Sequence, residues 1–512
     1  MTRLCRGDAC AAPPARTRRQ FLSAALVGLA PKTDRPISGG FIDDGHEPGH
    51  LLRDRAPFPR AKQIITIPLV IVGGGIAGLS AAWWLDKRGF RDFVLLEMRD
   101  RAGGNARWGE NEITAYPWAA HYVPVPGKKA VLVRELFEDL GVLHDGVWEE
   151  RYLCFSPQER LYLHGRWQDG IEPLTAATPQ DRADFARFAA RMNEFRSTGR
   201  FTIPMELGAM PSTLDNLSIA AWLEQERFTS PYLRWYINYA CRDDYGALAE
   251  DTSAWAGVHY FASREPDEKG PLSWPEGNGW IVRRLLEKLG GYVRSSAMVR
   301  RISRDSRRLR VSAADTDYLA GCVIFAAPSF LAPYICEDSP PVGNFVYSPW
   351  LTANLTLDRL PAERGIETAW DNVIYDSPAL GYVVATHQSL RTHIDRSVWT
   401  FYWSLAQGSP GANRRLLLEK DWNYWKEAIL NDLSRSHPDI RQCVSRIDVL
   451  RLGHAMARPV PGFLAAGDRV RLAGSSGDLL FANSDLSGFS IFEEAQYRGV
   501  KAAERALRRL SR

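Results

Sequence analysis

Cysteine is scarce in this 512-residue sequence, and long hydrophobic runs are missing. The seven cysteines are an odd number with no Cys-x-x-Cys pair, which argues against a metal site and against a disulfide framework. The apolar segment near the N-terminus, residues 23–30, is far shorter than the ~20 residues needed to span a bilayer. We therefore expect no bound metal, and we do not expect this segment to be an ordinary membrane span.

An excess of one charge is also missing from most of the chain. The net charge is +4, and residues 1–30, with five arginines and one aspartate, account for all of it. The remainder is formally neutral, so no basic face for nucleic acid is indicated. A hydrophobic content of 45% and a charged content of 24% are ordinary for a globular protein. The length is sufficient for two domains or two interleaved lobes.

The N-terminal arginines precede the short apolar segment in the order of a targeting signal. Thr17-Arg18-Arg19-Gln20-Phe21-Leu22 resembles a bacterial twin-arginine signal, which implies export of a protein already folded around its cofactor. We expect residues 1–31 to engage the export machinery and to direct the protein to the periplasm. Pro31 disfavours cleavage, so the alternative is a signal retained as a membrane anchor; a disordered basic tail is a second alternative. Residues 32–62, with scattered Gly, Pro, Asp and His, are predicted to be a linker.

A strand, a glycine turn and a helix follow this linker. Residues 67–72 are a short β-branched run typical of a buried parallel strand. The turn Gly73-x-Gly75-Ile76-Ala77-Gly78 allows backbone to approach a pyrophosphate, and the following helix favours its charge. A second strand at 93–96 delivers Glu97, 19 residues after Gly78, where an acid can accept hydrogen bonds from a ribose. The pattern predicts dinucleotide binding; a glycine-rich turn in an ordinary α/β domain is the alternative.

The residues after this acid indicate which dinucleotide is bound. Glu97-Met98-Arg99-Asp100-Arg101-Ala102-Gly103-Gly104 resembles the second glycine motif of the flavin amine oxidase superfamily, which includes protoporphyrinogen oxidase and the phytoene desaturases. The resemblance implies FAD and an α/β fold, in which a Rossmann-type (GR2-like) FAD-binding domain is interleaved with an α+β substrate-binding domain. The family usually has Arg after the glycine pair, whereas this chain has Asn105. How the diphosphate charge is neutralised is therefore an open question.

The resemblance covers residues 67–124, 274–328 and 471–507, so it implies an FAD-binding domain in three parts. We expect these parts at 63–127, 274–345 and 465–512. The substrate domain is expected at 128–273, which is helix-rich, and at 346–464.

The later blocks supply the other FAD contacts that the resemblance implies. Val299, in a strand predicted at 297–302, would meet the adenine, and Ala327 would end a strand beside the dinucleotide. A strand from Arg471 and a turn at Gly477 would lead to Asp478, which is suited to the ribityl hydroxyls. The last helix, beginning at Ser490-Ile491-Phe492, would direct its N-terminus at the flavin pyrimidine. No cysteine lies where some relatives attach FAD, so noncovalent binding is expected.

His121 is the candidate catalytic residue. The family places a turn of small residues beside the flavin ring, and the corresponding residues here are Ala119-Ala120, directly before His121. An ordinary histidine pKa of ~6.5 would allow proton transfer near neutral pH. A histidine satisfied by backbone in a packed turn is the alternative. Many amine oxidases carry a lysine near flavin N5, but Trp350-Leu-Thr-Ala-Asn354 contains none, which weakens the specific assignment as an amine oxidase.

Three functions remain after this reading. The first is an FAD-dependent oxidoreductase that oxidises a small organic substrate, for which an amine is one candidate, by hydride transfer to flavin N5, with O₂ or another electron acceptor. The second is a desaturase or isomerase of an apolar substrate, and the third is a non-catalytic flavin-binding protein of the cell envelope. Substrate identity and oligomeric state are left open.

Overall fold

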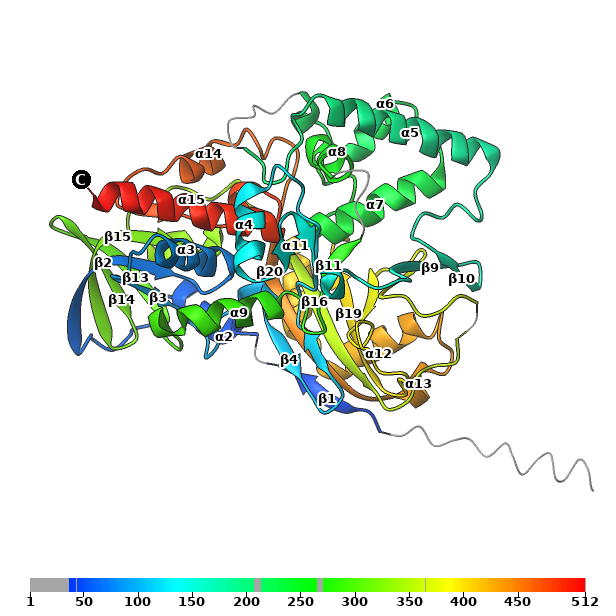
Figure 1. Ribbon diagram of the computed structural model, residues 1–512, viewed down its shortest axis with the longest axis horizontal. Coiled ribbons are helices and arrows are strands. Elements are labelled where there is room, and N and C mark those ends of the chain that lie inside the picture. The colour runs from blue at the N-terminus through cyan, green and yellow to red at the C-terminus, as the bar shows by residue number, and fades with distance from the viewer. Residues whose placement is uncertain (1–35, 43, 207–212, 265–269, 364, 512) are drawn as a thin grey trace, which may run out of the picture. The chain divides into compact units, whose positions relative to one another are not determined.

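The computed structural model describes residues 36–42, 44–206, 213–264, 270–363 and 365–511. The predicted export signal, residues 1–31, lies outside these ranges. From Ile37 onward, two large β-sheets form the centres of two lobes, and helices cover their faces (Figure 1). This arrangement confirms the predicted α/β class. In none of the described ranges does a helix have the length and hydrophobicity required to cross a lipid bilayer.

The first sheet takes its strands from separated parts of the chain. In sheet order these are β12 (Val293–Arg294), β3 (Phe93–Leu96), β2 (Gln63–Val72), β15 (Thr316–Phe325), β14 (Arg308–Ala313) and β13 (Val299–Asp305), with β21 (Leu479–Phe481) also paired to β15. β2 runs parallel to β3 and to β15, and β21 also runs parallel to β15. Val70 and Val72 face one hydrophobic cluster and Leu69 and Ile71 the other, because side chains alternate along a strand.

Helices cover both faces of this sheet. One face carries α3 (Ile76–Lys87), α4 (Val131–Asp139), α9 (Gly279–Leu289) and α15 (Phe492–Leu510), and the other carries α2 (His46–Arg53), α10 (Ala332–Ile335) and α14 (Gly467–Ala473). α15 crosses α3 in close contact at Gly499. A Cβ built on Gly499 would lie 2.1 Å from the carbonyl oxygen of Ala77, so only glycine fits without moving a helix.

The second sheet has eight strands and forms the centre of the other lobe. Their order is β1 (Ser38–Phe41), β20 (Val444–Arg458), β16 (Val346–Leu357), β19 (Ser397–Ser404), β18 (Gly381–Val384), β17 (Asp371–Ile374), β9 (Glu159–Leu163) and β10 (Arg166–Asp169). One face is covered by α11 (Pro410–Glu419), α12 (Trp422–Leu433) and α13 (Ile440–Cys443). Trp425 and Ile429 of α12 are fully buried against this face, as expected for an amphipathic helix.

A helical segment completes this lobe, as the spacing of apolar residues predicts. It contains α5 (Pro179–Ser197), α6 (Ile219–Gln225), α7 (Pro231–Tyr245) and α8 (Ala254–Ala262). α5 begins at a capping box in which Thr178 and Asp181 satisfy each other's backbone N–H groups. Short strand pairs lie elsewhere: β4 (Trp108–Glu110) with β5 (Ala115–Pro117), β6 (Tyr122–Pro124) with β11 (Pro271–Ser273), and β7 (Leu143–His144) with β8 (Val147–Trp148).

Two sequence-based predictions are wrong. Residues 32–62 are not a linker throughout, because β1 pairs with β20 and Leu52 of α2 is 5% exposed in the hydrophobic core. The segment is mostly polar, so its few buried apolar residues formed no recognisable pattern in the sequence. No strand begins at Arg471, which lies in helix α14; the strand comes later, at 479–481.

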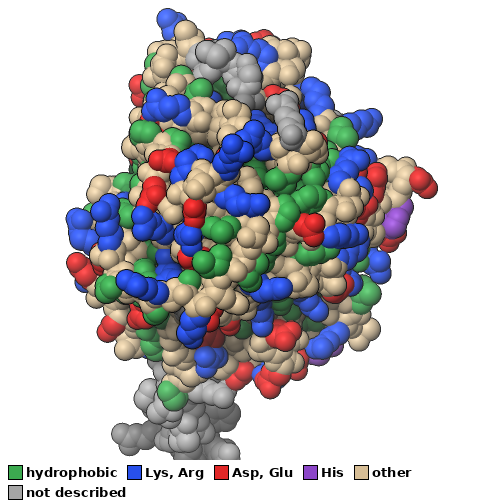
Figure 2. Space-filling view, turned by 90° about the vertical axis from the view of Figure 1, so that its left-hand side faces the viewer, with side chains coloured by type: hydrophobic (Ala, Val, Ile, Leu, Met, Phe, Trp, Pro, Cys, Tyr) green, Lys and Arg blue, Asp and Glu red, His purple; other side chains and the backbone are tan. Residues whose placement is uncertain are grey.

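Basic and acidic side chains are interspersed on the surface of the first lobe. Figure 2 shows them mixed across the face turned to the viewer. This pattern agrees with the near-zero charge of the chain beyond its N-terminal segment.

Candidate cofactor and substrate site

A glycine turn connects β2 to α3 at the carboxyl edge of the first sheet. Gly73 has φ +105°, and a Cβ there would lie 2.9 Å from the backbone nitrogen of Ala327, so the turn sits directly against the end of β15. Gly75 precedes α3, and no described side chain caps this helix. The first N–H groups of the helix, including those of Ile76 and Ala77, can therefore receive an anion.

The glycines of the second segment contact the first segment through their backbone. The N–H of Gly103 donates to the carbonyl of Gly74 at 2.8 Å, and a Cβ on Gly104 would lie 3.2 Å from the Cα of Gly75. Glu97 fixes the first turn, because its Oε2 accepts from the N–H of Gly74 at 2.8 Å. The structure thus brings the two predicted glycine motifs and the predicted acid together.

The remaining residues of this segment lead outward from Glu97. Met98 is half-buried, and the N–H of Arg99 donates to Oε1 of Glu97 at 2.9 Å. The carbonyl of Glu97 accepts from the N–H of Ala297 at 2.8 Å, two residues before Val299. Val299 therefore lies close to the acid, where a ribose and its adenine would be held.

Asn105 connects this edge to the turn before His121. Its side-chain Nδ2 donates to the carbonyl of Ala455 at 2.9 Å, and its own carbonyl accepts from the N–H of Ala120 at 2.9 Å. Asn105, which stands where the family usually has arginine, thus connects its own segment to those of Ala455 and Ala120 through hydrogen bonds.

The start of α15 lies near the same edge. Ile491 is its N-cap, Phe492 packs on Phe137, and Ser490 Oγ accepts from the N–H of Ala457 at 3.2 Å. Glu494 in the first turn is fully buried and forms an ion pair with Arg498 at 3.1 Å.

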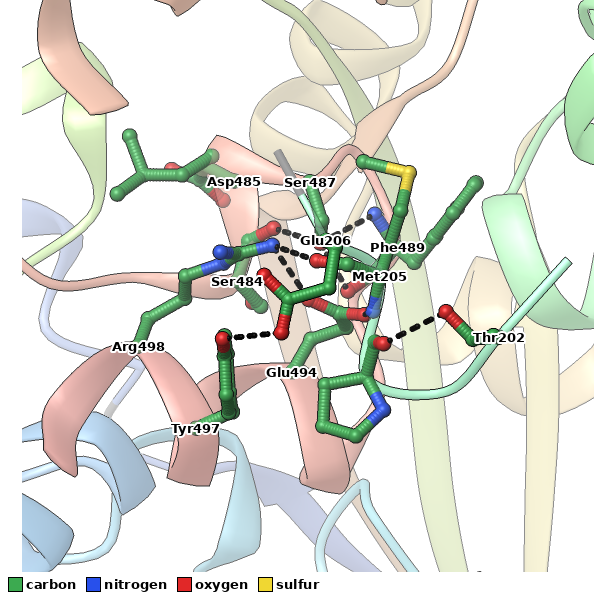
Figure 3. A network of polar contacts seen from close by, with 12 residues as sticks. Thr202, Met205, Glu206, Ser484, Asp485, Ser487, Phe489, Glu494, Tyr497 and Arg498 are labelled. Atoms are coloured by element: carbon green, nitrogen blue, oxygen red, sulfur yellow. Dashed lines mark hydrogen bonds and ion pairs between the residues drawn. The ribbon is translucent and has the colours of Figure 1, made fainter. Parts of the chain in front are cut away.

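Figure 3 shows how Glu494 and Arg498 hold a loop over this helix. Glu494 accepts from the N–H of Met205, and Arg498 donates to the carbonyl of Met205 at 2.6 Å. Tyr497 donates to Glu206 at 2.6 Å. The two charged side chains of the Glu494–Arg498 pair therefore both fix the loop before residue 207 to the first turns of α15.

The predicted placement of Gly477 and Asp478 is wrong. Asp478 precedes β21, whose Leu479 is level with Val323, so the acid lies several residues back from the carboxyl edge of the sheet. Its carboxylate accepts from Arg509 at 2.9 Å, near the far end of α15, and Gly477 is exposed.

Asp485, in contrast to Asp478, does lie at the carboxyl edge, and it was not predicted from the sequence. It follows β21, and its Oδ2 accepts from the N–H of Ser329 at 2.8 Å and from the hydroxyl of Tyr347 at 2.7 Å. The available signal was an apolar strand ending directly before Asn483-Ser484-Asp485, the same pattern that identifies Glu97.

A cavity of about 260 Å³ borders the start of α15. Glu493 lines it, is 1% exposed, and its Oε2 has no hydrogen-bond partner in the described part of the chain. Burial raises the pKa of Glu493 to about 7. An orphaned polar atom here, together with the open space in front of Gly75, fits a cofactor that combines a diphosphate with a hydrogen-bonding ring, as FAD does.

His121 lies in an aromatic group between the lobes. Its ring centroid is 5.0 Å from Tyr402, 5.7 Å from Trp370 and 5.2 Å from Tyr122. Nδ1 donates to the carbonyl of Ala119 at 2.9 Å, which leaves Nε2 as an acceptor. Burial lowers the pKa of His121 to about 4. The prediction that His121 titrates near neutral pH is therefore wrong.

Carboxylates lie beside this aromatic group, and we use the name acidic chamber for the cluster of His121, Tyr122, Asp243, Trp370, Asp371 and Tyr402. Tyr402 donates to Asp371 Oδ1 at 2.8 Å. Burial, followed by repulsion from Glu159, raises the pKa of Asp371 to about 7. Burial, with repulsion from Asp244, Asp371 and Glu159, raises the pKa of Asp243 well above its ordinary value.

Further acids mark an approach to the chamber. Glu159 is the parallel neighbour of Asp371 in the second sheet and is solvent-exposed. Desolvation of the carboxyl group raises its pKa, and repulsion from Glu172 adds to the effect. The approach and the chamber were not foreseen, because their acids are isolated in sequence and come from β9, α7 and β17.

The aromatic residues of the helical segment divide into two groups. Trp235 and Tyr239 stack at 5.6 Å within the cluster that contains Tyr402 and Trp370. Trp255 and His259 are instead core residues, 1% and 2% exposed, and pack on Phe201 and Phe489 respectively.

Comparisons with known proteins agree with this arrangement. The NAD(P)-binding Rossmann-like domain family matches residues 71–140, which contain both glycine segments. A putative flavin-containing monoamine oxidase of Mycobacterium tuberculosis (strain CDC 1551 / Oshkosh) is 25% identical over 279 residues, 51% of this chain and 57% of that protein. The similarity thus spans 57% of the length of that relative and only 19% of the length of a Baeyer-Villiger monooxygenase of Penicillium patulum, which is 29% identical over 125 residues, 24% of this chain.

Solved structures show the shared fold. Putrescine oxidase bound to putrescine aligns with a TM-score of 0.66 at 18% identity, covering 86% of this chain and 99% of that one. A CLA-producing fatty acid isomerase from P. acnes aligns with a TM-score of 0.61 at 14% identity, covering 86% and 98%. The fold is therefore that of the amine oxidase structures, and it also serves an isomerase.

Proposed function

We propose that the protein is an FAD-dependent oxidoreductase whose substrate is an organic amine cation. The observation that carries the proposal is the acidic chamber beside His121. Several carboxylates share one desolvated region with aromatic rings, and burying like charges together is costly unless a cation joins them. Aromatic faces add cation–π attraction to an ammonium group.

The residues of the chamber divide the work between binding and orientation. The acids near Glu159 attract the cation, and Asp371 and Asp243 hold it beside the rings of Tyr402 and Trp370. His121, neutral at physiological pH, offers Nε2 as an acceptor for a substrate N–H. Bound FAD supplies the redox chemistry by accepting a hydride equivalent from the carbon next to nitrogen. The printed names of the similar proteins, a monoamine oxidase and putrescine oxidase, support the same class of substrate.

An apolar substrate is the second candidate function. The lack of a lysine at residues 350–354 and the similarity to a fatty acid isomerase favour it. The chamber disfavours it, because an aliphatic chain would offer no positive charge to Asp371 and Asp243, beyond the hydrogen bond that Tyr402 donates to Asp371 and the attraction of Arg242 for Asp243.

Anaerobic reduction of the purified flavoprotein separates these functions. We expect an aliphatic monoamine or diamine to bleach the flavin absorbance, and an unsaturated fatty acid to leave it unchanged. Bleaching by the fatty acid alone would favour the second candidate. A flavin that no amine and no fatty acid reduces would favour a non-catalytic role.

We also propose that the protein is exported. The Arg18-Arg19 pair before an apolar segment supports this location, and O₂ is a plausible electron acceptor outside the cytoplasm.

A further inference from the structure

The segment from Asp44 to Arg53, which we call the strap, lies against the FAD-binding edge of the first sheet. It contains α2, and Leu52 anchors it among the core residues that include Val72 and Leu96 at the ends of β2 and β3. Asp44 anchors its other end, accepting from Arg451 of β20 at 2.9 Å. The strap is thus fixed to both lobes at the edge where the glycine turns meet.

The strap contacts the second glycine motif directly. Gly45 has φ +67°, and a Cβ built there would lie 2.6 Å from Nη2 of Arg99. Any larger residue would therefore push the Arg99 guanidinium aside. Since Arg99 follows Glu97 by two residues, the backbone of the strap lies over the segment that holds the dinucleotide.

Two imidazoles project from the strap at this place. His46 Nδ1 donates to Asp44 Oδ1 at 2.5 Å, which leaves Nε2 for another partner. The ring of His50 is 5.4 Å from that of His46, and both are half-buried. His50 is also close enough to His454 to influence its pKa.

His454 connects the strap to the other side of the cofactor edge. Its ring stacks on Phe330 at 4.3 Å, and Phe330 lies three residues after Ala327, the residue in contact with Gly73. Residues 44–50 therefore lie beside three parts of the chain: the segment after β3, the segment after β15 and the middle of β20. The groups gathered here are Arg99 and three histidines, with Asp44 already paired to Arg451 and Glu47 exposed.

We propose that the strap is part of the FAD site and that His46 and His50, with Arg99, bind its diphosphate. The proposal rests on FAD being the cofactor, as argued above. It answers the question raised by Asn105, which is occupied by Ala455 and carries no charge. A guanidinium donates charge-assisted hydrogen bonds to phosphate oxygens, and an imidazole that carries both ring protons can donate from one nitrogen to a carboxylate, as His46 does to Asp44, and from the other to a phosphate.

The test compares flavins with and without a diphosphate on the full-length protein. Dissociation constants for FAD and for riboflavin are measured by fluorescence titration of protein stripped of flavin. We expect His46→Ala/His50→Ala to weaken FAD binding about tenfold or more and to change riboflavin binding less than about twofold. His46→Lys/His50→Lys should recover most of the FAD affinity, because a cation is restored.

His144→Ala/His393→Ala serves as the matched control, since both of these histidines are exposed and outside the strap. If the double alanine variant fails to fold, His46→Gln and His50→Gln singly should each weaken FAD binding at least about threefold. FAD affinity equal to wild type, or equal losses for FAD and riboflavin, would overturn the role of the strap. A wild-type protein that binds no flavin would instead overturn the proposed function.

Discussion

Gly75 is the residue at which the fold comes closest to the expected pyrophosphate. Among the described residues, and apart from its chain neighbours, the nearest atom to a Cβ there is the Cα of Gly104 at 4.0 Å, which leaves space for a ligand. Gly75→Val should therefore fold but lose FAD, because the side chain would occupy that space. Flavin absorbance per mole of purified protein measures the loss. Gly411→Val, at a position in α11 with nothing nearby, is the control and should keep its flavin.

His121 tests whether the chamber is a reaction site. We expect His121→Ala to keep its flavin and to reduce it at least ~100-fold more slowly with an amine substrate, as is typical when a positioned proton acceptor is removed. Because the pKa of His121 is about 4, its contribution should not change between pH 6 and 8. Stopped-flow absorbance follows the reduction. A wild-type rate combined with lower thermal stability would indicate that the histidine only packs.

Asp371 should make substrate binding depend on pH. Its pKa of about 7 means that the carboxylate ionises as the pH rises from 6 to 8, so an amine cation should bind more tightly over that range. The expected result is a KM that falls several-fold, on the scale of one charge-assisted contact. Asp371→Asn should have a high KM without this trend. Asp395→Asn, at an exposed position, should behave like wild type.

At the residue scale, local patterns in the sequence identified only part of the site. The glycines and Glu97 were predictable because turn, helix and acid are adjacent in the chain. We predicted that Asp478 lies at the cofactor site and did not predict Asp485. Both acids lie near the short strand β21 and follow glycine or polar residues, so the local sequence pattern did not distinguish them. The acids of the chamber could not be predicted, since tertiary packing alone brings Asp243 and Asp371 together.

The first turns of α15 form the element that joins the helical segment to the cofactor lobe. Glu494 and Arg498 are 0% and 4% exposed, and both bind Met205 of the loop. Removing one partner of a buried ion pair typically costs ~3–5 kcal/mol, because the other charge is left without compensation. Glu494→Gln should lose stability on that scale in a denaturant titration.

Glu504→Gln is the matched control on the same helix. Its ion pair with Lys501, at 3.2 Å, is partly exposed, and such surface pairs contribute only ~0.3–0.5 kcal/mol. Equal stability losses for the two variants would show that the buried pair does not fix the loop.

Among the elements, periodic apolar patterns predicted most helices and strands, and the failures have clear causes. The predictions of a strand at 93–96 and of a strand at 297–302 are confirmed by β3 and, from Val299, by β13. β1, with the sequence Ser-Gly-Gly-Phe, has weak strand propensity and forms only because β20 offers it a partner. In α14, Arg471 and Leu472 were expected to begin a strand, whereas burial of Leu472 follows a helical face.

For the whole molecule, the proposed export would depend on Arg18 and Arg19. The variant Arg18→Lys/Arg19→Lys should keep the protein in the cytoplasm, because a twin-arginine route requires the pair. It should still contain flavin, since folding would precede export. Cell fractionation followed by flavin extraction measures both. Unchanged export would point to a different signal.

The parallel pairing of β1 with β20 also bears on self-association. β20 would otherwise be the last strand of its sheet, and its backbone from Arg446 to Val449 would lack the partners that β1 provides. Uncovered strand edges recruit other chains and promote aggregation. The opposite edge is β10, which is only four residues long and begins and ends with the charged residues Arg166 and Asp169. The segment that precedes the glycine turns thus covers an edge of the second sheet. A recombinant chain that began at β2 would lack both β1 and the strap, and we expect it to aggregate more readily than the full-length protein.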